Sequence, residues 1–297
     1  MTKVDARQLE YFLAVVDHGG MNRAAQALYV AQPSLSQAIR ALERDLGTGL
    51  FDRVGRRLVL TQAGRALIEP ARQVVRGLAS ARASVDSVAG LEVGRVEVAA
   101  MPSQAVEPLG GMIRRFTRRH PGLSVAVRAA FTPGEVLGMV RGGVTEIGLA
   151  AGPEPLTATG VEVVRLGRQR FVLVAPAGAP FPGTVVRPGE LAGQRMIVGQ
   201  PGTGMRRLVD DLRATGVDLV DVVETEHREA ILPLVLAGVG VALLADSWAP
   251  LAEQAGARVL DLDPPAYLHL ALLHRTSGLT PPAQAFLACA GDSSADS

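Results

Sequence analysis

Residues 20–47 read GMNRAAQALYVAQPSLSQAIRALERDLG and decide the fold of the first part of the chain. Two short helical patterns, at 21–28 and 33–46, flank a short break. At about 100° per residue, the second pattern separates an apolar face from a polar one. The apolar face holds Leu35, Ala38, Ile39 and Leu42, and the polar face holds Pro33, Ser36, Gln37, Arg40 and Arg44. Hydroxyl, amide and guanidinium groups bind phosphates and base edges, so the pattern predicts a DNA-binding helix-turn-helix.

The segments in and after this stretch resemble the N-terminal signature of the LysR-type transcriptional regulators. They read QPSLSQAIRALE at 32–43, LG at 46–47, LFDR at 50–53 and LTQAG at 60–64. The resemblance implies an α/β protein with an N-terminal winged helix-turn-helix (all-α with a small β wing) and a long linker helix. A two-lobed α/β effector-binding domain, similar to periplasmic binding proteins, would follow. The expected ranges are 1–60, 61–90 and 91–297.

The DNA contacts are expected from the recognition helix and from the segment after it. Glycines mark turns at 47–60, and Arg53, Arg56 and Arg57 fall in this predicted β wing. Arginines on a wing bind backbone phosphates and add affinity without sequence information. An exposed turn without a partner is the alternative. The predicted DNA-binding residues are Arg23, Gln32, Pro33, Ser34, Ser36, Gln37, Arg40, Arg53, Arg56 and Arg57.

A long helix is predicted from residue 62 to residue 88, with Thr61 as its N-cap. Its apolar residues repeat as in a heptad seam. They are Leu67, Val74, Leu78, Ala81, Val85 and Val88. A helix of about 27 residues is about 40 Å long, too long to be covered by so small a head. A homodimer is therefore expected, which would also pair two reading heads on an interrupted palindrome in double-stranded DNA. Burial against the chain's own second domain is the alternative. The family resemblance adds a homotetramer.

Beyond residue 94, short apolar strands alternate with helical patterns, which predicts a mostly parallel sheet. Two separate strands are expected at 161–166 and 171–175, and one helix is expected over 106–120. By analogy with the family, lobe one would comprise about 91–166 and 265–297, and lobe two about 167–264.

Ligands of open α/β sheets bind at the carboxyl ends of the strands. Two loops in each lobe meet that condition, and several of them open a helix. Free N–H groups at a helix start favour an anion, so a small-molecule effector, an anionic one above all, is the expected ligand. Helix capping alone is the alternative for Ser103 and Thr203. The predicted effector-binding residues are Ser103, Gln104, Phe131, Thr132, Gly202, Thr203 and His227.

Composition excludes several other classes of protein. Residues 1–90 hold 12 Lys+Arg against 8 Asp+Glu, whereas the remainder has a net charge of −3, which fits a basic DNA-binding head. Cys289 is the only cysteine, so neither an intramolecular disulfide nor a cysteine-based zinc cluster is expected. A signal peptide and an apolar run of about 20 residues are both missing, so the sequence predicts a cytoplasmic protein without membrane partners.

Catalytic and cofactor motifs are also missing: there is no G-x-S-x-G, no Walker loop and no H-E-x-x-H. We therefore expect no enzyme, no cofactor and no metal. The hypothesis is a sequence-specific DNA-binding transcriptional regulator controlled by an effector between two α/β lobes. One alternative is a small-molecule-binding protein whose head serves oligomerisation only. An enzyme on the same scaffold is the other, and no motif supports it.

Overall fold

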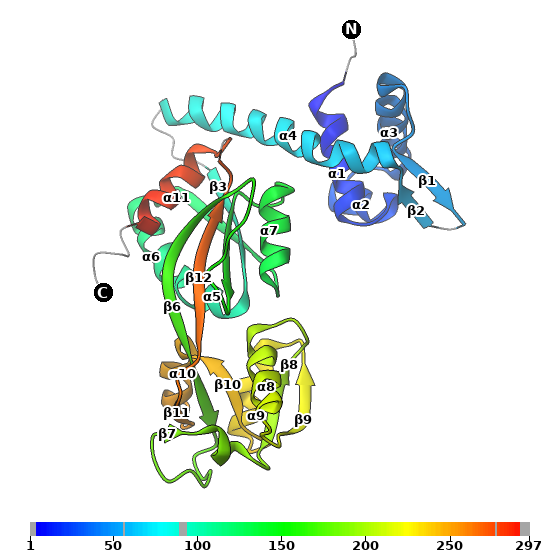
Figure 1. Ribbon diagram of the computed structural model, residues 1–297. Helices are drawn as coiled ribbons and strands as arrows, with labels where there is room; N and C mark the ends of the chain where they lie inside the picture. Colours follow the sequence, from blue (N-terminus) through cyan, green and yellow to red (C-terminus); the bar gives the residue numbers. More distant parts are fainter. Residues whose placement is uncertain (1–3, 56, 89–93, 277, 292–297) are drawn as a thin grey trace.

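The computed structural model describes residues 4–55, 57–88, 94–276 and 278–291. An N-terminal head, a long helix and an elongated α/β domain follow one another along the chain (Figure 1). The head and the long helix comprise α1 (Ala6–Asp17), α2 (Met21–Ala27), α3 (Gln32–Leu46), β1 (Phe51–Val54), β2 (Arg57–Leu60) and α4 (Gln62–Val88).

The head packs its three short helices around one apolar core. Leu35, Ile39 and Leu42 of α3 are buried, which confirms the predicted core face of the recognition helix. In α1 the residues that face this core are Leu9, Phe12, Leu13 and Val15. Gly47 ends α3 in the left-handed conformation, at a φ of 71° that favours glycine.

The predicted wing is a two-stranded antiparallel hairpin in which Phe51 pairs with Leu60. Glu43 of α3 holds the start of the wing, because its Oε1 accepts hydrogen bonds from the backbone N–H groups of Leu50 and Phe51. Of the predicted phosphate-binding residues, Arg56 lies outside the described residues, and only the backbone of Arg57 is described.

The linker helix α4 spans 27 residues, as predicted, and Thr61 caps it by accepting a hydrogen bond from the N–H of Gly64 at 2.9 Å. Its first half covers the head core with Leu67. Farther along, Val74 and Leu78 are 48% and 45% exposed, so the chain's own second domain does not bury this part of the seam. The side chains of Val85 and Val88 lie outside the described residues.

The α/β domain continues the chain with eight longer strands, two shorter ones and seven α-helices among the described residues. They are β3 (Gly94–Ala100), α5 (Pro102–Val106), α6 (Leu109–Arg119), β4 (Leu123–Ala129), α7 (Pro133–Arg141), β5 (Ile147–Gly152), β6 (Glu162–Ala175), β7 (Val185–Val186), β8 (Arg195–Gly199), α8 (Gly204–Ala214), β9 (Val220–Thr225), α9 (Arg228–Leu236), β10 (Ala242–Ala245), α10 (Ala249–Gln254), β11 (Arg258–Leu262), β12 (Tyr267–His274) and α11 (Pro281–Gly291). A short 3-10 helix, η2 (Asp246–Trp248), follows β10.

The sheet is mixed, so the prediction of a mostly parallel sheet is wrong. The strand order is β4-β3-β5-β12-β6-β11-β7, with β10 also on β6. β3 is parallel to β4 and β5, but β12 is antiparallel to both β5 and β6. Most antiparallel pairs involve β6: its residues 162–170 pair with β12, and its last residues, 171–175, pair with β10 and β11 in the other half of the domain (Figure 1).

Two further expectations about single elements are wrong. β6 is one continuous strand where two were predicted, because the polar residues around Gly167 continue the pairing with β12 instead of forming a loop. The helix predicted over 106–120 begins only at Leu109, as α6, and a separate short helix, α5, ends at Val106, so the chain is divided here. Pro108 explains the division, because a proline disfavours helical backbone at the residue before it.

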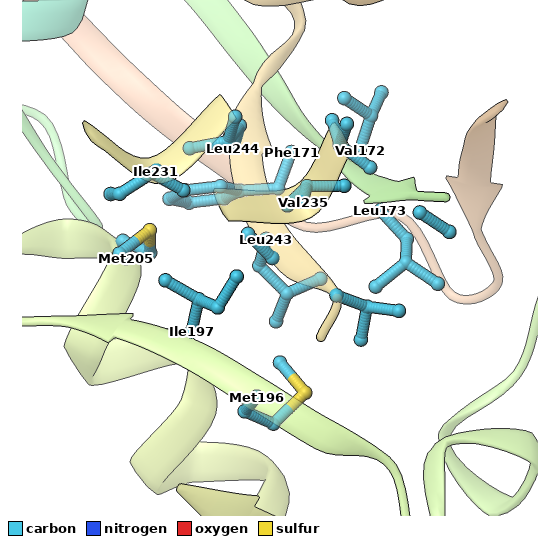
Figure 2. Close-up of a cluster of buried hydrophobic side chains, with 14 of the residues drawn as sticks. Phe171, Val172, Leu173, Met196, Ile197, Met205, Ile231, Val235, Leu243 and Leu244 are labelled. Carbon is cyan, nitrogen blue, oxygen red and sulfur yellow. The ribbon is translucent and has the colours of Figure 1, made fainter. Parts of the chain in front are cut away.

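Each half of the α/β domain has its own apolar core. Phe116 of α6 and Phe286 of α11 meet edge to face in the first half, with ring centroids 5.2 Å apart. In the second half, side chains from β6, β8, β10, α8 and α9 converge (Figure 2). We call these halves lobe one and lobe two. Cys289 is buried in the first core.

Candidate DNA-binding and effector sites

A groove of about 650 Å³ lies between the start of α2 and the wing, with the first residue of the recognition helix at its side. It is lined by Gly19, Gly20, Met21, Asn22, Arg23, Gln32, Arg53, Gly55 and Leu58. The structure therefore brings together three of the predicted DNA-binding residues, from α2, α3 and β1. Arg23 folds back on its own helix start, where its Nη2 donates to the carbonyl of Gly19 at 2.7 Å.

The polar face of α3 is open along its length. Pro33, Ser34, Gln37 and Arg40 are exposed, while Gln32 and Ser36 are partly buried. Within the described part of the chain, no carboxylate pairs with Arg40 or with Arg53 of β1. An exposed helix face beside uncommitted guanidinium groups suits base edges in a major groove and the phosphates that flank it.

The predicted effector residues of lobe one fall at the carboxyl ends of β3 and β4. Ser103 and Gln104 of α5 are buried. Gln104 Nε2 donates to Gln169 Oε1 of β6 at 2.8 Å, so a buried amide pair joins the lobe-one helix to the strand that crosses into lobe two. The helix α5 is only five residues long and therefore contributes little dipole to an anion site.

Thr132 caps α7, because its Oγ1 accepts a hydrogen bond from the N–H of Glu135 at 3.2 Å. The N–H of the neighbouring Phe131 donates to the carboxylate of the same glutamate. Thr132 also faces lobe two, since a Cβ added to Gly202 would lie 3.6 Å from Thr132 Cγ2. The predicted loops of the two lobes thus meet.

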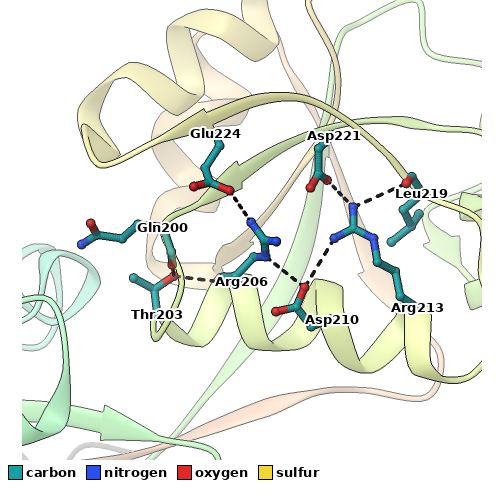
Figure 3. Close-up of polar contacts among 8 residues, drawn as sticks. All are labelled: Gln200, Thr203, Arg206, Asp210, Arg213, Leu219, Asp221 and Glu224. Atoms are coloured by element: carbon teal, nitrogen blue, oxygen red, sulfur yellow. Dashed lines mark hydrogen bonds and ion pairs between the residues drawn. The ribbon is translucent and has the colours of Figure 1, made fainter.

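In lobe two, Thr203 is buried and caps α8 (Figure 3). Its Oγ1 donates to the carbonyl of Gln200 at 2.9 Å and accepts from the N–H of Arg206 at 3.3 Å. His227 lies at the start of α9 with 80% of its side chain exposed, and its Nδ1 is 3.2 Å from Glu229 Oε1. His227 therefore does not join the facing loops in this structure.

Comparison with known proteins gives matches over nearly the whole chain. A family model described as "Bacterial regulatory helix-turn-helix protein, lysR family" matches residues 6–65, and one described as "LysR substrate binding domain" matches residues 89–295. The chain belongs to the LysR family of bacterial transcriptional regulators. The predicted fold class and the predicted kind of function, a regulator and not an enzyme, are confirmed.

Relatives and solved structures agree with this assignment. The chain is 29% identical to the HTH-type transcriptional regulator XapR of Escherichia coli (strain K12) over 250 residues, 83% of this chain and 84% of that protein. CbnR, a LysR family transcriptional regulator, has the same fold with a TM-score of 0.70 at 21% identity, over 99% of this chain and 100% of that chain. CbnR complexed with its target DNA gives a TM-score of 0.68 at 22% identity, over 98% and 100%. In the described parts of this regulator, no helix is long and apolar enough to cross a membrane.

Sequence reasoning missed a polar contact between the linker helix and lobe one of this LysR-family regulator. Arg72 Nη1 of α4 donates to the carbonyl of Gly142 at 3.1 Å, and its Nη2 lies 2.5 Å from Asp17 Oδ1 at the end of α1. Arg76 donates to the carbonyl of Gly143. Burial, followed by the charge of Arg275, lowers the pKa of Arg76. The one signal in the sequence for this contact is that Arg72 and Arg76 lie beside the apolar seam of the linker helix.

A second residue that the sequence did not single out is Arg228, the first residue of α9. Its Nη1 donates to the sulfur of Met205 at 3.7 Å. Burial lowers the pKa of Arg228. By contrast, Glu146 has a structural role, because its carboxylate accepts hydrogen bonds from the N–H and the Oγ1 of Thr280 at 2.7 and 2.9 Å.

Proposed function

We propose that α3 reads the major groove of an interrupted palindrome and that the wing holds the adjacent phosphates. The groove that joins Arg23, Gln32 and Arg53, beside the exposed face of α3, carries this proposal. The side chains assigned to DNA are Arg23, Gln32, Pro33, Ser34, Ser36, Gln37, Arg40, Arg53, Arg56 and Arg57. Base-edge contacts from α3 provide the specificity, and phosphate contacts provide the affinity.

The second part of the proposal is an effector that binds between the two lobes. The approach of Gly202 to Thr132 and the buried pair of Gln104 and Gln169 support it, because both join residues of the two halves of the domain. The assigned residues are Ser103, Gln104, Phe131, Thr132, Gly202 and Thr203. The exposed His227 reaches such a ligand only after a change of its rotamer.

The protein works as a dimer in this proposal, and two dimers form the tetramer. The exposed stripe of Val74 and Leu78 supports the dimer, because apolar side chains repeated along one helix face gain free energy by packing against a second copy. We assign residues 1–60 to DNA binding, 61–90 to dimerisation and 91–297 to effector binding. Since the partner is DNA, we place the regulator in the cytoplasm.

Effector binding changes the placement of the head through contacts of α7 and α4. The N-terminus of α7 carries Thr132, and the carbonyl groups after its C-terminus accept hydrogen bonds from Arg72 and Arg76. Arg72 also pairs with Asp17 in the head. A ligand that favours one placement of α7 therefore changes the placement of the head, to the extent that its affinity for the two arrangements differs.

The test of DNA reading is footprinting on the DNA upstream of the protein's own gene at two salt concentrations. A protected interrupted palindrome that persists at the higher salt is the expected result. Arg40→Ala should weaken binding to this site by about 1–3 kcal/mol and leave nonspecific binding almost unchanged, because it removes a base contact. Arg118→Ala, an exposed arginine of α6, is the matched control. Equal losses on specific and nonspecific DNA would assign Arg40 to phosphates. Diffuse protection that vanishes with salt would instead favour a ligand-binding protein whose head serves oligomerisation.

A further inference from the structure

The start of α9 lies at the edge of lobe two that faces lobe one. β8 and β9 are parallel, so their carboxyl ends lie at the same edge, and α8 and α9 begin just beyond them. Met205 of α8 covers the end of β8, because a Cβ added to Gly199 would lie 3.1 Å from Met205 Cε. Arg228 reaches this methionine, whose helix begins directly after the Gly202 loop that meets Thr132 of lobe one.

Arg228 differs from Arg206, the other half-buried arginine of this edge, in having no acidic partner. Arg206 lies 2.9 Å from Asp210 Oδ1 and 2.5 Å from Glu224 Oε2 (Figure 3). Arg213, at the opposite end of α8, is also paired, with Asp210 and Asp221. For Arg228, the only hydrogen bond to a described residue is the weak one to the sulfur of Met205.

None of the carboxylates nearest to Arg228 in the sequence pairs with it in the structure. Glu224 is bound by Arg206, Glu229 faces His227 at 3.2 Å, and Glu226 is exposed to solvent. Arg228 is half-buried, and this burial lowers the pKa of its guanidinium without a neighbouring charge that offsets it. A guanidinium removed from water without a counter-charge destabilises the protein that holds it. Such a cost is typical of a binding residue whose partner is the ligand.

We propose that Arg228 binds the carboxylate or phosphate group of an anionic effector at the lobe-two side of the interlobe site. This inference rests on the proposed effector site and names the chemistry of its ligand. A guanidinium presents paired N–H donors that match both oxygens of a carboxylate or phosphate. The hydroxyl and amide side chains on the lobe-one side, Ser103 and Gln104, then recognise the uncharged part of the same molecule.

The only tryptophan, Trp248, provides an intrinsic probe for this site. It belongs to η2, which contacts both α5 and β6 and thus the junction of the lobes. The probes are sodium phosphate and sodium benzoate at tens of millimolar, with sodium chloride at matched ionic strength and uncharged benzamide as references. The readouts on the full-length protein are Trp248 emission and the melting temperature.

Arg228→Met removes the charge and keeps much of the side-chain volume, and Arg207→Met on the exposed face of α8 is the matched control. Without added anion, we expect Arg228→Met to melt above the wild type, because a half-buried charge without an acidic partner is gone. Phosphate or benzoate should raise the melting temperature of the wild type and of Arg207→Met beyond the effect of chloride. The anion affinity of Arg228→Met should be at least tenfold weaker.

Three results would overturn the inference: a lower melting temperature for Arg228→Met without anion, an equal anion response in both proteins, or no anion response in the wild type. If benzamide raised the melting temperature of the wild type and of Arg228→Met equally, the anionic character of the effector would be contradicted. The proposal of an effector site between the lobes would remain. The footprint on DNA tests the regulator function separately, because Arg228 lies in lobe two and outside the DNA-binding head.

Discussion

Replacing Arg72 with methionine should loosen lobe one from the linker helix. The side chain of Arg72 is 12% exposed and that of Asp17 is 52% exposed, so their ion pair contributes about 0.5–1 kcal/mol. The hydrogen bond from the charged Arg72 to the carbonyl of Gly142 adds about 1–1.5 kcal/mol. Arg72→Met should therefore cost about 1.5–2.5 kcal/mol, roughly a ten- to sixtyfold change in an equilibrium constant.

The assay is urea denaturation with two signals. Trp248 fluorescence reports on the α/β domain, whereas far-ultraviolet circular dichroism also follows the helices of the head and linker. Asp17→Asn removes only the ion pair and should cost at most about 1 kcal/mol. Because Asp17 loses its partner in Arg72→Met, the double variant should be about as stable as Arg72→Met alone.

Two results would refute this reasoning. If Arg72→Met unfolds within about 0.5 kcal/mol of the wild type, the contact between α4 and lobe one does not stabilise the chain. If the two single changes simply add, Arg72 and Asp17 do not interact in solution.

Two further predictions concern the contacts of the linker helix α4. Gly143→Ala and Gly160→Ala should both lose about 1 kcal/mol, since the two glycines have φ of +63° and +75°. Only Gly143→Ala displaces Arg76, so it should melt lower than Gly160→Ala, and Arg76→Met should abolish that difference. Leu78→Glu should dissociate the dimer in analytical ultracentrifugation, because it places a charge in the apolar stripe; Val185→Glu, at a residue 46% exposed on β7, should leave the dimer intact.

The sequence was most informative where one element carries its own periodicity. Leu35, Ile39 and Leu42 repeat with the period of a helix, and the run from residue 62 to residue 88 has few breaks, so α3 and α4 could be predicted closely. β6 could not, because its middle residues are polar. Their strand conformation is determined by pairing with β12, about 100 residues later in the chain.

The same distinction holds for the candidate sites: a site within one element could be predicted, and a site assembled from distant segments could not. The polar face of α3 belongs to one helix and could be identified from spacing alone. Arg228 and Gln169 could not be distinguished from surface residues in the sequence, because burial and the lack of an acidic partner depend on distant segments. The sequence offered both a ligand contact and a helix cap for Thr203, and the two hydrogen bonds of its hydroxyl at the start of α8 show the cap.

The coupling between the sites depends on α7 acting as one rigid piece. This helix of nine residues is about 13 Å long, with Thr132 against lobe two at one end and Gly142 against Arg72 at the other. Closure of the lobes on a ligand therefore either moves α7 against α4 or strains the hydrogen bonds of Arg72 and Arg76. By linkage, DNA that favours one placement of the head changes effector affinity by the same factor. A variant such as Arg72→Met should still bind DNA and effector. In this variant, however, binding of one ligand should no longer change the affinity for the other.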